Sequence, residues 1–179
     1  PLAILQTKLE LFAEEHPAMD AETAGLVSSL REQLDRLTAL VRTLLEMSNL
    51  QSISRTDQIA LASLVEEILT DLTPLAQKNN ISLQQDCAEL GMVGSDALIY
   101  RLVFNLVENG IKYNRLDGAV HVTLRREKQT AVLRVADTGP GIPADCRESI
   151  FQPFFRVDKS RSREMGGVGL GLALVREIA

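Results

Sequence analysis

Apolar residues in the first third of the chain recur at the spacing of an α-helix. In residues 2–12, and again in residues 26–44, they return every three or four positions and so share one helical face. His16 stands before Pro17, which disfavours helical backbone, so the first helix is predicted to end there. Asp20 is a suitable cap for the second helix. The pattern predicts an antiparallel helical hairpin.

The apolar stripe of the second helix is wider than a two-helix hairpin can cover. Val27, Leu40 and Leu45 extend it beyond the main line of leucines. A hairpin alone would leave much of this surface in water. Two arrangements remain open: two copies form a four-helix bundle, or the hairpin packs on the rest of its own chain.

Polar residues 52–57 mark a change of pattern and are taken as a domain boundary. Beyond it, apolar residues at helical spacing alternate with short runs in which every second residue is apolar, the spacing of a half-buried strand. The last two strands are predicted to form an antiparallel hairpin. The expected order is helix 61–78, strand 81–83, helix 98–107, strand 120–124 and strand 131–135.

Composition limits the possible functions. The chain has 179 residues, 45% of them hydrophobic, with a net charge of -5. An acidic chain is a poor partner for nucleic acid. No apolar run is long enough to cross a bilayer and no signal peptide is apparent, so this part of the protein is expected to be soluble. Cys87 and Cys146 lack metal-ligand spacing and are expected to be free thiols.

The segment from Asn105 to Asn114 concentrates polar residues at the end of an apolar helix. Asn105 and Asn109 are four positions apart and share a helical face, and Lys112 lies near it. Amide oxygens are hard, neutral ligands suited to magnesium that is already bound to phosphates. The alternative is a helix whose polar face carries asparagine without a ligand. Tyr113 is one of only two tyrosines in the chain.

Two glycine-rich segments follow. Asp137 ends a strand and precedes Gly139 and Gly141, a pattern that fits either hydrogen bonding to an exocyclic amine such as that of adenine or a plain turn capped by aspartate. The second segment, residues 166–171, precedes a helix-like end, where backbone N–H groups favour phosphate. It is neither a Walker A loop nor a Rossmann fingerprint.

Between the glycine segments lie three phenylalanines and a basic stretch. The phenylalanines, at positions 151, 154 and 155, fit core packing. The basic residues Lys159, Arg161 and Arg163 fit a mobile lid over phosphates, or an exposed loop.

In order and spacing, these motifs resemble the N, G1, F and G2 boxes of bacterial sensor histidine kinases. Their ATP-binding fold is shared with gyrase and the heat-shock chaperone ATPases, and the resemblance runs from about Asp57 to the end of the chain. It implies an α+β protein: an amino-terminal antiparallel helical hairpin, half of a dimeric four-helix bundle, then a two-layer α/β sandwich with a mixed sheet. Residues 1–54 would be the dimerisation and histidine phosphotransfer domain, and residues 55–179 the catalytic ATP-binding domain.

The resemblance also implies roles for single residues. Asn109 would ligate Mg²⁺, with Asn105 supporting the phosphates or the metal, and Lys112 would contact phosphate. Tyr113 would lie near the nucleoside and Asp137 would bind the adenine amine. Other nucleotide contacts would come from Gly139, Gly141, Ile142, Gly167, Gly169, Leu170 and Gly171. Arg156 would reach the γ-phosphate, unless it is a solvated surface charge.

One substitution bears on the reaction. ATP-hydrolysing relatives of this fold carry a glutamate where this chain has Asn105, and an amide cannot take the proton from water. Transfer to a protein imidazole is then favoured over hydrolysis. Glu108 lies nearby in sequence, but its helical phase differs from that of Asn105.

The resemblance places the phosphoacceptor histidine shortly before Pro1, and further strands after Ala179. His16 and His121 are expected to be surface residues, not replacements. The fragment is therefore predicted to bind Mg-ATP without autophosphorylating. The whole protein is expected to be a homodimer that phosphorylates a response regulator, with this part cytoplasmic and joined to a bacterial inner membrane only through upstream segments. The alternatives are a non-kinase ATPase of the same fold, and a signalling dimer that acts through conformation or as a regulator phosphatase.

Overall fold

The computed structural model describes residues 1–50, 53–157 and 169–179 and divides into two compact units. The first is Pro1–Ser48 and the second Asn49–Ala179. This division comes before the polar stretch 52–57, and so before the boundary predicted after residue 54. Each unit is described by itself.

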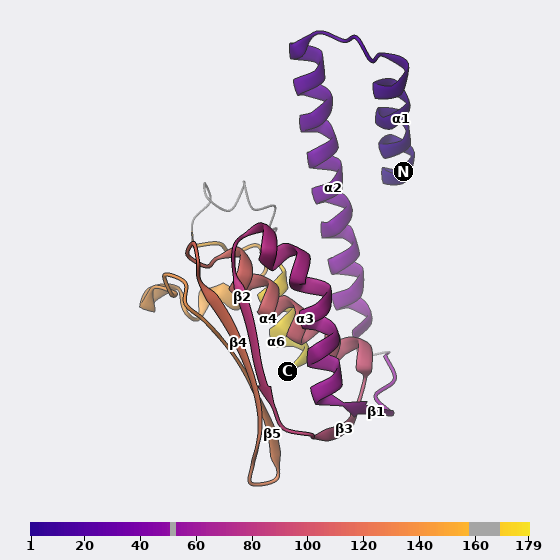
Figure 1. Ribbon diagram of the computed structural model, residues 1–179. Helices are drawn as coiled ribbons and strands as arrows, with labels where there is room; N and C mark the ends of the chain where they lie inside the picture. The colour runs from indigo at the N-terminus through magenta and orange to yellow at the C-terminus, as the bar shows by residue number, and fades with distance from the viewer. Residues whose placement is uncertain (51–52, 158–168) are drawn as a thin grey trace. The chain divides into compact units, whose positions relative to one another are not determined.

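The first unit is the predicted helical hairpin. α1 (Leu2–Glu15) and α2 (Ala21–Asn49) are joined by a short turn (Figure 1). Asp20 caps α2 as expected: Oδ1 accepts the backbone N–H groups of Glu22 at 3.0 Å and Thr23 at 2.9 Å. His16 follows α1, is exposed, and stacks on Phe12 with ring centroids 4.4 Å apart.

Apolar side chains stay exposed along both helices of the hairpin. They are Ile4, Leu5, Leu11, Phe12, Leu26, Leu30, Leu37, Val41, Leu44 and Leu45. An exposed apolar surface of this width predicts that another helical surface covers it, as the sequence pattern did. Among the described residues, no helix has the length and apolar character that a bilayer crossing requires.

The second unit contains two small sheets. β2 (Ser82–Cys87), β4 (Ala119–Glu127) and β5 (Thr130–Asp137) form a three-stranded mixed sheet with β4 in the centre. β4 pairs with β5 as the predicted antiparallel hairpin and with β2 in parallel. β1 (Asp57–Ala60) and β3 (Gly91–Gly94) form a separate antiparallel pair that the sequence pattern did not predict.

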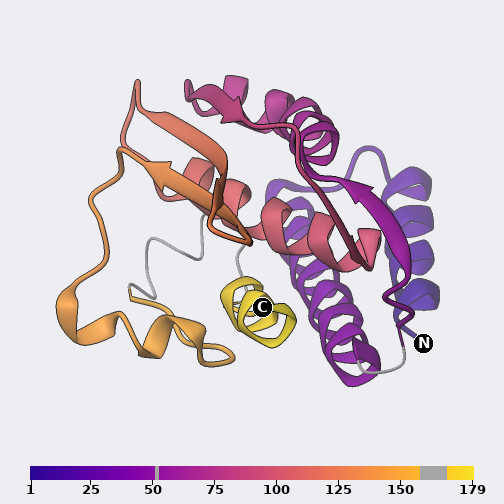
Figure 2. The ribbon, with the colours of Figure 1, turned by 90° about the horizontal axis from the view of Figure 1, so that it is seen from below.

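Helices α3 (Leu61–Lys78) and α4 (Asp96–Lys112) pack against one face of the three-stranded sheet, which completes the expected two layers (Figures 1 and 2). Val120, Val122 and Leu124 point from β4 into this interface and are fully buried. They alternate with exposed residues such as His121, as strand geometry requires. The predicted α+β class is therefore confirmed.

The short helix α6 (Gly171–Ile178) packs against α4 (Figure 2). It buries Ala173, Leu174 and Val175. Two single-turn 3₁₀ helices, η2 (Ala144–Cys146) and η3 (Ser149–Phe151), lie between β5 and α6 in sequence. α4 thus has the sheet on one side and α6 on another. The side of α4 that carries Asn105 and Asn109 faces the start of α6.

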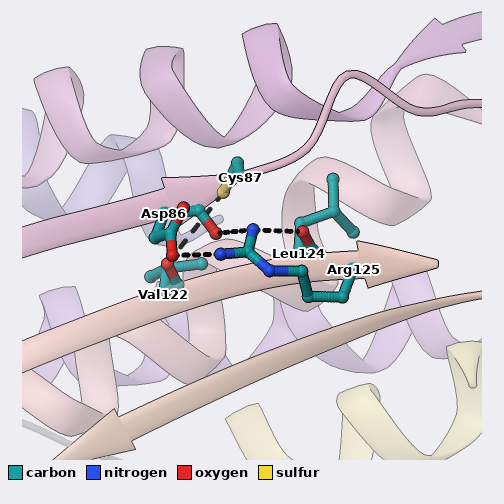
Figure 3. Close-up of polar contacts among 5 residues, drawn as sticks. All are labelled: Asp86, Cys87, Val122, Leu124 and Arg125. Carbon is teal, nitrogen blue, oxygen red and sulfur yellow. Dashed lines mark hydrogen bonds and ion pairs between the residues drawn. The ribbon is translucent and has the colours of Figure 1, made fainter. Parts of the chain in front are cut away.

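The two cysteines are free thiols, as predicted. Cys87 lies at the end of β2, where its Sγ is 4.0 Å from the carbonyl oxygen of Val122 (Figure 3). Partial burial raises the pKa of the Cys87 thiol, so it stays protonated at neutral pH. Neither cysteine has the lowered pKa of a reactive thiol.

Candidate functional site

The polar face of α4 lies against the start of α6. Asn105 Nδ2 donates to the carbonyl oxygen of Arg101 at 2.7 Å, which leaves Oδ1 on the side of α6. A Cβ built on Gly171 would lie 2.6 Å from Asn105 Oδ1 and 3.8 Å from Asn109 Nδ2. The fold therefore brings together both amides and the second glycine segment, which are far apart in sequence.

The start of α6 offers hydrogen-bond donors beside these amides. Leu174 N donates to Leu170 O at 2.9 Å, which is the first intrahelical bond of α6. The N–H groups of the preceding turn have no intrahelical acceptor, as in any helix. No side chain of the described residues caps this terminus. A set of free N–H groups at the positive end of a helix dipole favours an anion.

Lys112 lies one turn beyond Asn109, but its ammonium is paired. Its Nζ is 2.8 Å from Oε1 of Glu108, and the two side chains are only 23% and 27% exposed. The carboxylate of Glu108 is thus engaged in an ion pair with Lys112. Among the described residues, no group of three or more acidic, histidine or cysteine side chains could hold a metal ion. A metal here would depend on amide and phosphate oxygens.

Asp137 ends β5 beside α4. Its Oδ1 accepts the backbone N–H of Gly139 at 2.8 Å, and no second hydrogen bond to this carboxylate occurs within the described residues. Gly110 of α4 leaves space here, because a Cβ on it would be 3.6 Å from Asp137 Cβ and 3.2 Å from Val120. The exposed carboxylate therefore has an oxygen available for an external donor.

Tyr113 follows α4 and is 44% exposed. Its carbonyl oxygen would be 2.8 Å from a Cβ on Gly139, so the end of α4 and the first glycine segment are in close contact. Gly141 has φ +76°, which strongly favours glycine, and faces open space. Ile142 is also exposed. Gly139 thus joins Asp137 to the end of α4, and Tyr113, Gly141 and Ile142 are open to solvent.

The phenylalanine segment contacts the second glycine segment. Phe154 N donates to Gly169 O at 2.9 Å, and a Cβ on Gly169 would be 2.8 Å from the carbonyl oxygen of Phe155. Gly169 also has φ +78°. The side chain of Leu170 is buried, so only its backbone could contact a ligand. Gly167 and the basic residues Lys159, Arg161 and Arg163 lie outside the described residues.

Arg156 is not the solvated surface charge that the sequence left open as an alternative. Its Nε and Nη2 atoms are buried, with no hydrogen-bond partner among the described residues. Its Cγ would be 3.2 Å from a Cβ on Gly169, so the side chain borders the second glycine segment. Buried guanidinium donors normally have an acceptor, and an anionic ligand would supply one.

Two polar residues in this region were not predicted from the sequence. Asn114 and Thr138 hydrogen bond to each other at 3.0 Å, between the end of α4 and the end of β5. Asn114 ends the polar segment that starts at Asn105, and Thr138 directly follows Asp137, so their places in these two motifs were what could have drawn attention to them. Their residue types alone indicate only turns.

Residues 94–179 match the family model described as "Histidine kinase-, DNA gyrase B-, and HSP90-like ATPase". The chain is 34% identical over 99% of its length to the sensor histidine kinase RppB of Synechocystis, covering 40% of that protein. It is 36% identical over 80% of its length to the sensor-like histidine kinase SenX3 of Mycolicibacterium smegmatis, covering 38%. The chain thus spans about two fifths of these relatives.

Solved structures show the same architecture. The mycobacterial sensor histidine kinase MprB superposes with a TM-score of 0.60 at 26% identity, over 69% of this chain and 77% of that one. The catalytic domain of histidine kinase ThkA gives 0.62 at 26% identity, over 70% and 80%. ShkA, solved with AMPPNP, gives 0.70 over 99% of this chain and 40% of that one, but its 24% identity supports the fold alone.

Proposed function

We propose that this chain, which belongs to the bacterial two-component sensor histidine kinase family, is a kinase core that binds Mg-ATP and transfers the γ-phosphate to a histidine of the longer protein. The observation that carries the proposal is the contact between the amides of α4 and the start of α6. It places one hard oxygen ligand, Asn105 Oδ1, together with the side-chain amide of Asn109, beside a helix terminus that favours anions.

The metal and the phosphates fit this region. Asn109 would ligate Mg²⁺ and Asn105 would support the metal or the phosphates. The ion, when bound, would neutralise phosphate charge. Asn105 Oδ1 accepts no hydrogen bond from the described residues and already points toward α6, as a ligand oxygen should.

The phosphate chain would be held by cations and by backbone. Arg156 has buried donors without a described acceptor, which suits contact with the γ-phosphate. Lys112 would have to exchange its ion pair with Glu108 for a phosphate oxygen, or share it. Gly169, Leu170 and Gly171 would contribute backbone N–H groups, with Gly167 completing the segment.

The nucleoside would lie over the exposed region between α4 and β5. The free oxygen of Asp137 would accept a hydrogen bond from the adenine amine, because its other oxygen is occupied by Gly139 N. Tyr113, Gly141 and Ile142 would contact the nucleoside from the sides.

Transfer to an imidazole is favoured over hydrolysis because no carboxylate stands at position 105. Asn105 cannot accept a proton from water, and Glu108 is paired with Lys112. The phosphohistidine would then donate to an aspartate of a response regulator. The exposed apolar stripe of α1 and α2 supports a homodimer through the hairpin. We place this core in the cytoplasm, with any membrane attachment in other parts of the protein.

Calorimetric titration tests the proposal. ADP and a non-hydrolysable ATP analogue are titrated with and without Mg²⁺ into the chain, Asn109→Ala and the control Gln84→Ala, which removes an exposed amide from β2. Magnesium-dependent binding that is lost only in Asn109→Ala is the expected result. Equal binding by all three proteins would refute the metal assignment. ATP turnover without phosphotransfer in the longer protein would favour the non-kinase ATPase instead.

A further inference from the structure

The side chain of Asn114 joins the end of α4 to the sheet. Its Nδ2 donates to Gly110 O at 2.9 Å and to Ala119 O at 3.0 Å. Its Oδ1 accepts Arg115 N at 2.9 Å and Thr138 Oγ1 at 3.0 Å. An amide has two donor hydrogens and two acceptor lone pairs, so all four are used. Rotating the amide by half a turn would place its oxygen against the two carbonyl oxygens and its NH₂ group against the Arg115 N–H.

Thr138 completes this arrangement from the end of β5. Its Oγ1 accepts Ala119 N at 2.9 Å while its backbone N–H donates to Ala119 O at 3.1 Å. Gly118 makes the approach possible: a Cβ there would overlap Asn114 Oδ1 and lie 2.7 Å from Thr138 Oγ1. Asn114, Gly118, Ala119 and Thr138 are called the Asn114–Thr138 cluster below.

The cluster lies between the two segments that would hold the nucleoside. Asn114 directly follows Tyr113, and Thr138 directly follows Asp137. Gly139, next in the chain, donates to Asp137 Oδ1 and lies against the Tyr113 carbonyl. A change in the cluster therefore alters the placement of the Asp137 carboxylate relative to the end of α4.

We propose that Asn114 and Thr138 are positioning residues that set the preference of the site for adenine. The inference rests on the proposed nucleotide-binding function and deepens it. Neither side chain needs to contact the nucleotide, because both act through Asp137. A well-oriented Asp137 carboxylate binds the exocyclic amine of adenine more tightly than a base that lacks this amine. A poorly placed carboxylate discriminates less between the two bases.

The test compares ADP with IDP, whose base has a carbonyl in place of the amine. Affinities are measured for the chain, Thr138→Val and Thr138→Ser. Valine keeps the shape of threonine but can neither donate to Asn114 nor accept from Ala119, whereas serine keeps both bonds. The ratio of ADP to IDP affinity is expected to fall about five- to tenfold in Thr138→Val, the equivalent of one hydrogen bond, and to persist in Thr138→Ser.

The outcomes separate the two levels of the proposal. A purely structural role of the cluster would weaken ADP and IDP binding by one common factor and leave their ratio unchanged, which would overturn the inference alone. A parent chain that binds neither nucleotide, or binds both equally, would overturn the adenine-binding function and the inference with it. If Thr138→Val does not fold, the ratio of ADP to IDP affinity is measured in Thr138→Ala instead, and the same fall is expected.

Discussion

Gly171 approaches Asn105 so closely that a Cβ on the glycine would lie 2.6 Å from the Oδ1 atom of the amide. Asn105 cannot easily give way, since its Nδ2 is bonded to the Arg101 carbonyl. The packing of α6 on α4 and the orientation of the Asn105 amide therefore depend on the absence of a side chain at position 171.

Gly171→Ala is expected to destabilise the second unit by about 1 kcal/mol, because overpacking outweighs the conformational gain of alanine. It should also weaken ADP binding, since Asn105 must turn away from the start of α6. Urea unfolding and calorimetry measure the two effects. Gly91→Ala is the matched control in the same unit, where a new Cβ makes only ordinary contact at 3.6 Å. Equal losses in both variants would contradict the assignment of strain to position 171.

Tyr100 on α4 donates a 2.5 Å hydrogen bond to Asp71 on α3 and stacks on Phe104. Tyr100→Phe keeps the ring and removes the hydroxyl, so it should lower the free energy of unfolding by about 1 kcal/mol. Tyr113→Phe is the control, since that hydroxyl has no hydrogen-bond partner among the described residues. Comparable destabilisation in both variants would count against the Asp71 bond.

Tyr100 should also make the free energy of unfolding depend on pH. Burial, followed by the bond to Asp71, raises the pKa of Tyr100 to about 12 from 10.0. A raised folded-state pKa means that this contribution to stability is complete below pH 10 and is lost as the pH rises toward 12. Unfolding free energies of the parent chain and Tyr100→Phe should therefore converge over this interval. A constant difference across it would refute the raised pKa.

Arg125 connects the ends of β2 and β4 in two ways (Figure 3). Its Nη2 pairs with the Asp86 carboxylate, and its Nη1 donates to the carbonyl oxygens of Asp86 and Leu124 at 2.9 and 3.0 Å. Both side chains are about half exposed. Asp86→Asn should thus cost less than about 1 kcal/mol, because the carbonyl bonds persist and water screens the pair.

The cost of Asp86→Asn should shrink further in 1 M salt, where screening acts within about 3 Å. Nucleotide affinity should not change. Glu127→Gln, which breaks the similarly exposed pair with Arg134, provides the comparison. A loss of nucleotide binding in Asp86→Asn would show that this edge of the sheet is coupled to the site.

Asp20 should matter for the hairpin through its capping bonds. Asp20→Ala is expected to lower the thermal midpoint of the first unit, whereas Asp20→Asn keeps a capping oxygen and most of the stability. The backbone hydrogen bond from Thr23 lowers the pKa of the Asp20 carboxyl below 3.8. The advantage over Asp20→Asn should be present above pH 3.8 and disappear as the pH falls through the lowered pKa. Far-ultraviolet circular dichroism follows both effects, and a pH-independent difference would contradict the second.

Local patterns in the sequence were enough to predict most elements. The helical spacing in α3 and α4 and the alternation in β4 and β5 were confirmed, because each of these elements turns one apolar face toward the core. The helical spacing in α2 was also confirmed, although its apolar face stays exposed. The Asp20 cap was also predictable, since its hydrogen bonds go to residues two and three positions away. β1 and β3 were missed: each is only four residues long, and they pair across more than thirty positions of chain.

The amino-acid sequence by itself determined which residues are candidates for the site, because the asparagines, the aspartate and the glycines stand in motifs of fixed order and spacing. Only the tertiary structure decided which of them meet. The contact between Asn105 and Gly171, the parallel pairing of β2 with β4, and the bond between Asn114 and Thr138 join segments far apart in the chain. Such contacts depend on how buried faces pack together, and local spacing carries no information about that packing.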